Sequence, residues 1–207
     1  MRQYLQEDLA EDLVHGMCVG KFAHELGKEL ALDKKFCYEL ALGGVLHDVG
    51  KLRISPYVYG RQEDGMLVEE LQYMRKHTYL GYKIIEQKGY SEIVRNMVLY
   101  HHENFDGTGY PARLKGTDIP LEARIIKVCD VFAALLENRP YRKAFDVNTA
   151  AQILIEEAKD FDMKILLAFQ RVIGSEEIIE EIEGILRLDV KNLHIRFSGK
   201  NISHVEI

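Results

Sequence analysis

The chain has 207 residues, 47% of them hydrophobic, and a formal net charge of −6. This length is enough for one well-buried domain and does not require a second. The acidic balance argues against general binding to DNA or RNA polymers and to membrane surfaces, which need clustered positive charge. Between Arg113 and Lys143, however, basic side chains outnumber acidic ones, so a small anionic ligand could bind there.

The cysteines and the N-terminus indicate a cytoplasmic protein. Cys18, Cys37 and Cys129 lie far apart in apolar stretches, so we expect neither a disulfide framework nor a cysteine metal knot. No apolar run approaches the roughly 18 residues that cross a membrane. The first residues also lack the charged and then apolar layout of a secretory signal.

Apolar residues at helical spacing predict a largely helical chain. Asp33, Ser91 and Asp146 are placed to cap helices. Stretches rich in glycine and proline predict loops at 53–67 and 103–120, and a basic loop follows at 139–143. The expected helices cover about 5–30, 34–46, about 69–88, 92–100, 121–138, 147–158 and 163–173.

The sequence pattern changes after residue 174. Residues 175–188 predict an acidic helix with a solvated face. Residues 193–197 and 202–207 alternate in the manner of two short strands joined by a turn. We therefore expect a C-terminal β-hairpin that packs on the helices or on a second subunit.

The stretch from His101 to Pro111 is the strongest candidate for a functional site. It holds two adjacent imidazoles, the carboxylates of Glu103 and Asp106, and two glycines. Such residues make poor core material, because buried polar and charged groups need partners. The cluster is better explained as a site.

Other nitrogen and oxygen donors in the chain suit a multinuclear metal centre. Taken alone, however, most of them also have a common structural explanation. Glu11 and His15 are four residues apart on one helix face, as in many surface pairs. His77 on an apolar face is usually a satisfied core histidine, whereas Asp130 is costly in so apolar a helix unless it is paired or bound to metal. The remaining pair, His47 and Asp48, is followed by Gly50, which can permit a sharp turn, and by Lys51.

Taken in order, these motifs resemble the HD-GYP branch of the HD-domain metal phosphohydrolases. The resemblance runs from about Glu11 to Asp162. Its motifs are His47-Asp48 with Gly50-Lys51, His77 with Gly81, His101-His102-Glu103, Asp106-Gly107-Thr108-Gly109-Tyr110-Pro111, Asp130, and Arg139-Pro140-Tyr141-Arg142.

The resemblance implies an all-α bundle, here over residues 1–174 with 175–207 as an extension, whose core holds two or three divalent ions. It implies hydrolysis of cyclic di-GMP to pGpG, GMP or both by a metal-bridging hydroxide. Imidazole and carboxylate donors without thiolate suit iron or manganese. The implied metal ligands are Glu11, His15, His47, Asp48, His77, His101, His102 and Asp130, with Asp48 bridging.

The resemblance also assigns other roles. Lys51 would contact the scissile phosphate, and Asp48 and Lys51 would form the catalytic pair. Independently of the resemblance, a carboxylate such as Glu103 or Asp106 could orient a ligating imidazole. The implied nucleotide site consists of Lys51, Gly109, Tyr110, Pro111, Arg139 and Arg142.

The sequence departs from the family in places and leaves alternatives open. Residues 54–56 and 61–65 differ from the usual lid pattern, and Ala133 replaces an aspartate common in the family. The altered lid keeps open another cyclic dinucleotide or a nucleotide as substrate. A catalytically silent module that binds cyclic di-GMP is a further alternative, and either a homodimer or a regulatory protein partner is compatible with the chain.

Overall fold

The computed structural model describes residues 2–58, 72–139 and 142–188, and within these ranges the chain is helical and has no strand. The all-α prediction is confirmed, whereas the expected hairpin lies outside the described residues. The elements are α1 (Arg2–Glu29), α2 (Lys34–Leu46), α3 (Lys51–Val58), α5 (His77–Gln87), α6 (Glu92–Tyr100), η1 (Gly116–Asp118), α7 (Leu121–Leu135), α8 (Val147–Glu156), η2 (Ala158–Asp160), α9 (Met163–Ile173) and α10 (Glu176–Leu186).

The three predicted caps are present at the helix starts. The side chain of Asp33 accepts a hydrogen bond from the backbone N–H of Phe36 at 3.0 Å. The side chains of Ser91 and Asp146 likewise accept hydrogen bonds from the backbone N–H groups of Val94 and Thr149. These short polar side chains satisfy N–H groups that the first turn of a helix leaves without a partner.

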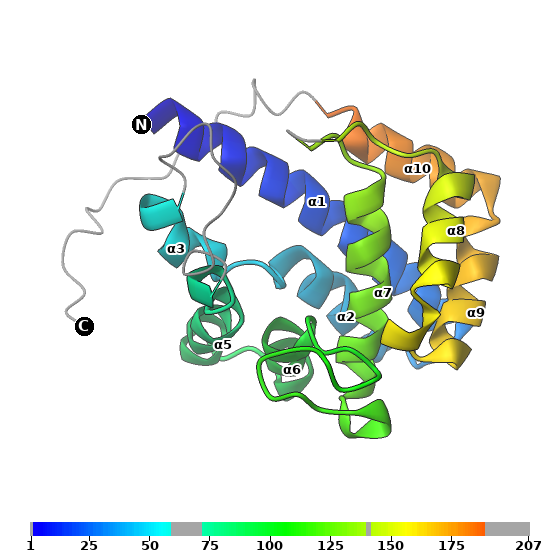
Figure 1. Ribbon diagram of the computed structural model, residues 1–207, viewed down its shortest axis with the longest axis horizontal. Coiled ribbons are helices and arrows are strands. Elements are labelled where there is room, and N and C mark those ends of the chain that lie inside the picture. The colour runs from blue at the N-terminus through cyan, green and yellow to red at the C-terminus, as the bar shows by residue number, and fades with distance from the viewer. Residues whose placement is uncertain (1, 59–71, 140–141, 189–207) are drawn as a thin grey trace.

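The core lies between α1, α7 and α9. Phe22, Phe132 and Phe169, one from each helix, are fully buried and meet edge to face, with ring centroids 5.2 to 5.4 Å apart. Figure 1 shows α8, α9 and α10 gathered at one end of the bundle and α3 and α5 at the other, with α7 between them. None of the helices in the described ranges has the length and apolar composition needed to span a bilayer.

Two glycines let α1 and α2 meet backbone to backbone. A Cβ atom added to Gly44 would lie 2.5 Å from the Cα atom of Gly20. Any side chain at that position would push the two helices apart. The close contact brings His15 of α1 and His47, which follows α2, to a ring-centroid distance of 5.3 Å.

Gly50 has a similar role between α2 and α5. The expected turn is present at residues 47–50, but Gly50 does not adopt a positive φ, so conformational freedom is not the reason for a glycine at this position. Instead, an added Cβ would lie 1.9 Å from the carbonyl oxygen of His77. Gly50 is therefore required for the close approach that places His77 beside Asp48.

The predicted loop at 53–67 is wrong for its first part, because α3 extends to Val58. Backbone hydrogen bonds from Lys51, Leu52 and Arg53 to residues three positions earlier continue the turn after α2 directly into α3. Ile54 is fully buried and anchors this helix. Residues 59–67 lie outside the described part of the chain.

Two other predicted helices have different limits. The helix expected at about 69–88 is interrupted by a turn at Arg75 and Lys76, so His77 is the first residue of α5. The helix expected to reach residue 138 ends at Leu135. There the guanidinium of Arg142 donates hydrogen bonds to the carbonyl groups of Ala134 and Leu135.

The acidic C-terminal helix is present as α10 and packs on the bundle. Ile182 is buried in the core, and Glu181 forms an ion pair with Lys21 of α1 at 2.5 Å. The acidic residues of its first turn, Glu176 and Glu177, are exposed, as predicted.

We predict that Gly50→Ala destabilises the protein by about 3 kcal/mol, because overpacking against a backbone carbonyl group cannot be relieved by a rotamer change. The matched control is Gly184→Ala in α10, where an added Cβ meets no atom within 4 Å. That control should be neutral or stabilising by up to about 1 kcal/mol. Thermal unfolding followed by circular dichroism measures both, and equal melting temperatures for the two variants would contradict the packing argument.

Candidate metal centre

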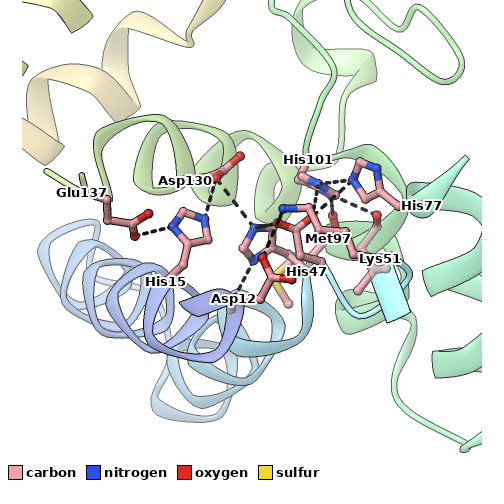
Figure 2. A network of polar contacts seen from close by, with 12 residues as sticks. Asp12, His15, His47, Lys51, His77, Met97, His101, Asp130 and Glu137 are labelled. Carbon is pink, nitrogen blue, oxygen red and sulfur yellow. Dashed lines mark hydrogen bonds and ion pairs between the residues drawn. The ribbon is translucent and has the colours of Figure 1, made fainter. Parts of the chain in front are cut away.

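The eight predicted metal ligands lie on five separate segments of the chain. His15 lies in α1, His47 and Asp48 follow α2, His77 begins α5, and His101 and His102 follow α6. Asp130 lies in α7. Figure 2 shows the side chains of His15, His47, His77, His101 and Asp130 turned toward one another.

The histidines and Asp48 form two overlapping groups of donor atoms, and Oδ1 of Asp130 lies 3.0 Å from Nε2 of His15. Within each group, one nitrogen or oxygen atom per residue lies within 4.8 Å of the others. Both groups include Asp48, which therefore lies where two neighbouring cations could share a carboxylate. The first group is Asp48, His77, His101 and His102, and the second is His15, His47 and Asp48.

The backbone fixes the orientation of three of the imidazoles. Nδ1 of His47 donates to the carbonyl group of Gly44 at 2.7 Å. Nδ1 of His77 donates in the same way to Met74 at 2.6 Å, and Nδ1 of His101 to Val98 at 3.0 Å. Because a carbonyl group only accepts hydrogen bonds, each Nδ1 carries the proton, and each Nε2 points into the centre.

Burial keeps several of these imidazoles neutral. It lowers the pKa of His77 and, with nearby imidazoles adding to the effect, holds the pKa of His101 well below its usual value. Burial also lowers the pKa of His102 to about 3. A neutral imidazole is the form that binds metal.

Three electron-rich atoms consequently face one another with no donor between them. Nε2 of His77 lies 3.2 Å from Nε2 of His101 and 3.3 Å from Oδ1 of Asp48. Oδ1 of Asp48 is buried and makes no hydrogen bond within the described part of the chain, and the same is true of Nε2 of His47. Such an arrangement is costly by itself, and a cation would relieve it. The residues therefore fit divalent metal ions.

Two neighbouring carboxylates favour the protonated form of His47. Burial alone would lower the pKa of this imidazole, but Asp48 and Asp130 raise it. Burial would also raise the pKa of Asp48, yet His47 and Lys51 hold it well below its usual value. Nζ of Lys51 lies 2.6 Å from Oδ2 of Asp48, so this lysine is positioned beside the donor atoms, as predicted.

His15 is held between two carboxylates. Its Nε2 lies 3.0 Å from Oδ1 of Asp130, and its Nδ1 lies 2.7 Å from Oε1 of Glu137. Burial by itself would lower the pKa of His15, but these two hydrogen bonds raise it to about 10.

Another acidic residue of α1, Asp12, lies beside Lys51 and was not among the predicted site residues. Glu11 is exposed and belongs to neither donor group. Oδ1 of Asp12 lies 3.6 Å from Nζ of Lys51, and burial raises the pKa of Asp12. The spacing of three residues between Asp12 and His15 also places both on one helix face, and this signal could have identified Asp12.

The loop after His102 folds back over that imidazole. The backbone N–H of Tyr110 donates to the carbonyl group of His102, and the two rings stack at 4.7 Å. The guanidinium of Arg75 lies 4.9 Å from the centre of the Tyr110 ring. Gly109 is buried and Pro111 is exposed next to this stack.

Glu103 and Asp106 contact the loop rather than an imidazole, in contrast to the expected role. The buried carboxylate of Glu103 accepts hydrogen bonds from the backbone N–H groups of Ala112 and Leu114. Asp106 accepts from the backbone and hydroxyl of Thr108. Loop N–H groups need acceptors and are the nearest donors, so these carboxylates shape the loop.

Both predicted arginines are occupied by protein groups. Arg139 forms an ion pair with Glu137 at 2.8 Å. Arg142 donates to carbonyl groups at the end of α7, and its guanidinium lies 4.4 Å from the centre of the Phe145 ring. Glu137 was missed by the sequence analysis, although it lies seven residues after Asp130, a spacing that returns to the same helix face.

Comparisons with known proteins agree with this geometry. The HD domain family matches residues 4–165. Cyclic di-GMP phosphodiesterase PA4108 from Pseudomonas aeruginosa is 30% identical over 184 residues, which are 88% of this chain and 43% of that protein. The 3'3'-cGAMP-specific phosphodiesterase 1 of Vibrio cholerae is 35% identical over 143 residues, which are 69% of this chain and 33% of that protein. This chain thus spans less than half the length of these relatives.

A solved structure shares the fold. The HDG"Y"P protein from Bdellovibrio bacteriovorus aligns with a TM-score of 0.64 and 23% identity, over 78% of this chain and 52% of that one. This likeness concerns the fold, whereas the family match over most of the chain and the curated relatives confirm the resemblance to the HD-GYP branch. The chain belongs to the HD domain family, which is metal-dependent.

Proposed function

We propose that this chain is a metal-dependent phosphodiesterase that hydrolyses cyclic di-GMP to pGpG, GMP or both. The observation that carries the proposal is the convergence of His77, His101 and Asp48, whose acceptor atoms face one another in a buried site. The Pseudomonas relative, similar over most of this chain, is named for activity on that substrate.

Two or three neighbouring ions would fit the two overlapping donor groups, and Asp48 belongs to both groups. The proposed ligands are His47, Asp48, His77, His101, His102 and Asp130, with Glu11 and His15 at a third position. Iron or manganese suits this set, because it combines imidazole and carboxylate without thiolate.

Bound ions would supply positive charge to the phosphate oxygens and acidify a water molecule that is otherwise a weak nucleophile. Lys51 adds a further cation beside Asp48, where it would stabilise charge that develops on the scissile phosphate. The same ammonium group lies 3.6 Å from Oδ1 of Asp12.

The loop over the centre would form the nucleotide surface. Tyr110 covers His102 by stacking, and this contact keeps the imidazole away from bulk water. Tyr110, Gly109 and Pro111 would line the bound nucleotide. Contact of Arg139 or Arg142 with phosphate or guanine would require each to leave its present partner. Lys51 is also ion-paired, but its partner Asp48 belongs to both donor groups, so this lysine lies beside the site where the phosphate would bind.

A second candidate function is hydrolysis of 3'3'-cyclic GMP-AMP by the same metal chemistry. It is favoured by the Vibrio relative, whose name states that specificity and which is 35% identical to this chain. A catalytically silent binding module has less support, because each of the six central ligand residues is present.

We predict that the manganese- or iron-loaded chain turns over cyclic di-GMP with a kcat/KM at least tenfold above that for 3'3'-cyclic GMP-AMP. Chromatography of the products from parallel reactions at equal substrate concentration measures both. The reverse ranking would favour the second candidate, and no turnover of any cyclic dinucleotide would contradict both.

Asp48→Asn should lower kcat by about a thousandfold or more, since loss of the shared carboxylate removes several kcal/mol of charge stabilisation. Metal content measured by mass spectrometry should fall in the same variant. The matched control is Glu177→Gln, which also replaces a carboxylate by an amide but lies exposed on α10. Full activity of the Asp48→Asn variant would exclude the proposed ligand role.

Removal of metal by a chelator should abolish turnover and lower the melting temperature. The temperature falls because ions that bind only the folded chain stabilise it by mass action. Differential scanning fluorimetry before and after addition of Mn²⁺ tests this, with Mg²⁺ added at the same concentration as the comparison. An unchanged melting temperature on chelation would count against a metal centre in the core.

A further inference from the structure

A chain of four hydrogen-bonded polar side chains leads away from the metal centre toward the surface. Asp130 contacts His15 at 3.0 Å, His15 contacts Glu137 at 2.7 Å, and Glu137 contacts Arg139 at 2.8 Å. The exposed fraction of the side chain is 6% for His15, 15% for Glu137 and 34% for Arg139. Figure 2 shows the part of this chain from Asp130 through His15 to Glu137.

His15 differs from the other imidazoles in its place along the helix. His47 and His101 follow the last turns of α2 and α6, where carbonyl groups lack helical partners. His77 uses the carbonyl group of Met74, which ends the helical turn before α5. His15 lies inside the 28-residue helix α1, where backbone carbonyl groups are used by the helix itself. Its Nδ1 therefore needs an acceptor from a side chain.

Glu137 supplies that acceptor and is itself held in place. One of its carboxylate oxygens accepts from His15 and the other from Arg139. The backbones of Arg139 and Arg142 pair with each other, and the guanidinium of Arg142 is bound to the end of α7. Glu137 is thereby fixed although it lies beyond the last residue of that helix.

We propose that Glu137 is a positioning residue that directs Nε2 of His15 toward the second donor group, and that Arg139 holds Glu137 in that orientation. This inference rests on the proposed metal binding. A carboxylate bound to the outer nitrogen of a ligating imidazole fixes the ring and increases its basicity. The role assigned to Arg139 differs from the substrate contact that the family resemblance implies.

The test is a titration of the metal-free full chain with Co²⁺. Calorimetry and the visible absorption of the bound ion measure the binding. We expect Glu137→Ala to lower the Co²⁺ affinity of the weakest site by about 10- to 100-fold and to alter the absorption of the ion bound there. The Co²⁺ affinity of the tighter site should not change. Glu137→Gln keeps an acceptor oxygen and should recover part of the affinity. Arg139→Ala should shift the same site in the same direction by a smaller factor.

The matched controls are Glu29→Ala and Arg171→Ala. These residues form a glutamate–arginine ion pair between α1 and α9, outside the donor groups, and should leave every Co²⁺ affinity unchanged. The controls show whether loss of a partly exposed ion pair on α1 affects metal binding in general.

The possible outcomes separate the inference from the proposed function. If the wild-type chain binds Co²⁺ and Glu137→Ala binds it with the same affinities and spectrum, the inference is wrong and the metal centre stands. If the wild-type chain binds no Co²⁺, the proposed function fails, and the inference fails with it. If Glu137→Ala does not fold, the test uses Glu137→Gln instead. Unchanged Co²⁺ affinities in that variant would overturn the role of Glu137.

Discussion

The centre depends on hydrogen bonds between imidazole Nδ1 atoms and carbonyl groups at helix ends. A helix leaves its last carbonyl groups without partners, and His47 and His101 use them at the ends of α2 and α6. Each bond fixes the tautomer and turns Nε2 inward. Burial then removes the water that would otherwise satisfy these atoms, so a cation becomes the partner that they lack.

Glycine contacts set how close these helix ends come. The approach of Gly20 to Gly44, and of Gly50 to the backbone of His77, leaves no room for a side chain at either position. A small shift of α2 against α1 or α5 would change the distances among His15, His47 and His77. The same contacts therefore determine the packing of the bundle and the geometry of the centre. A substitution that separates the helices would also change the distances among the imidazoles.

The sequence predicted the features that depend on local pattern. The helix caps at Asp33 and Ser91 follow from residue type and position, and both are present. His47, Asp48 and His77 were expected as metal ligands from the family resemblance, and the structure brings their side chains together. The helix α3 was missed because proline and glycine suggested a loop. What makes α3 helical is the run of backbone bonds from the turn after α2 and the burial of Ile54, and neither can be read from composition.

The residues that the sequence did not reveal act through tertiary contacts. Asp12 gains importance only because Lys51 lies beside it, and Glu137 only because α7 ends where α1 passes. The imidazoles suggest a general reason. A histidine at a helix end can orient itself on a backbone carbonyl group, whereas one inside a helix must use a side chain from elsewhere. A histidine predicted as a ligand in mid-helix thus implies a carboxylate partner, and only the fold identifies which one.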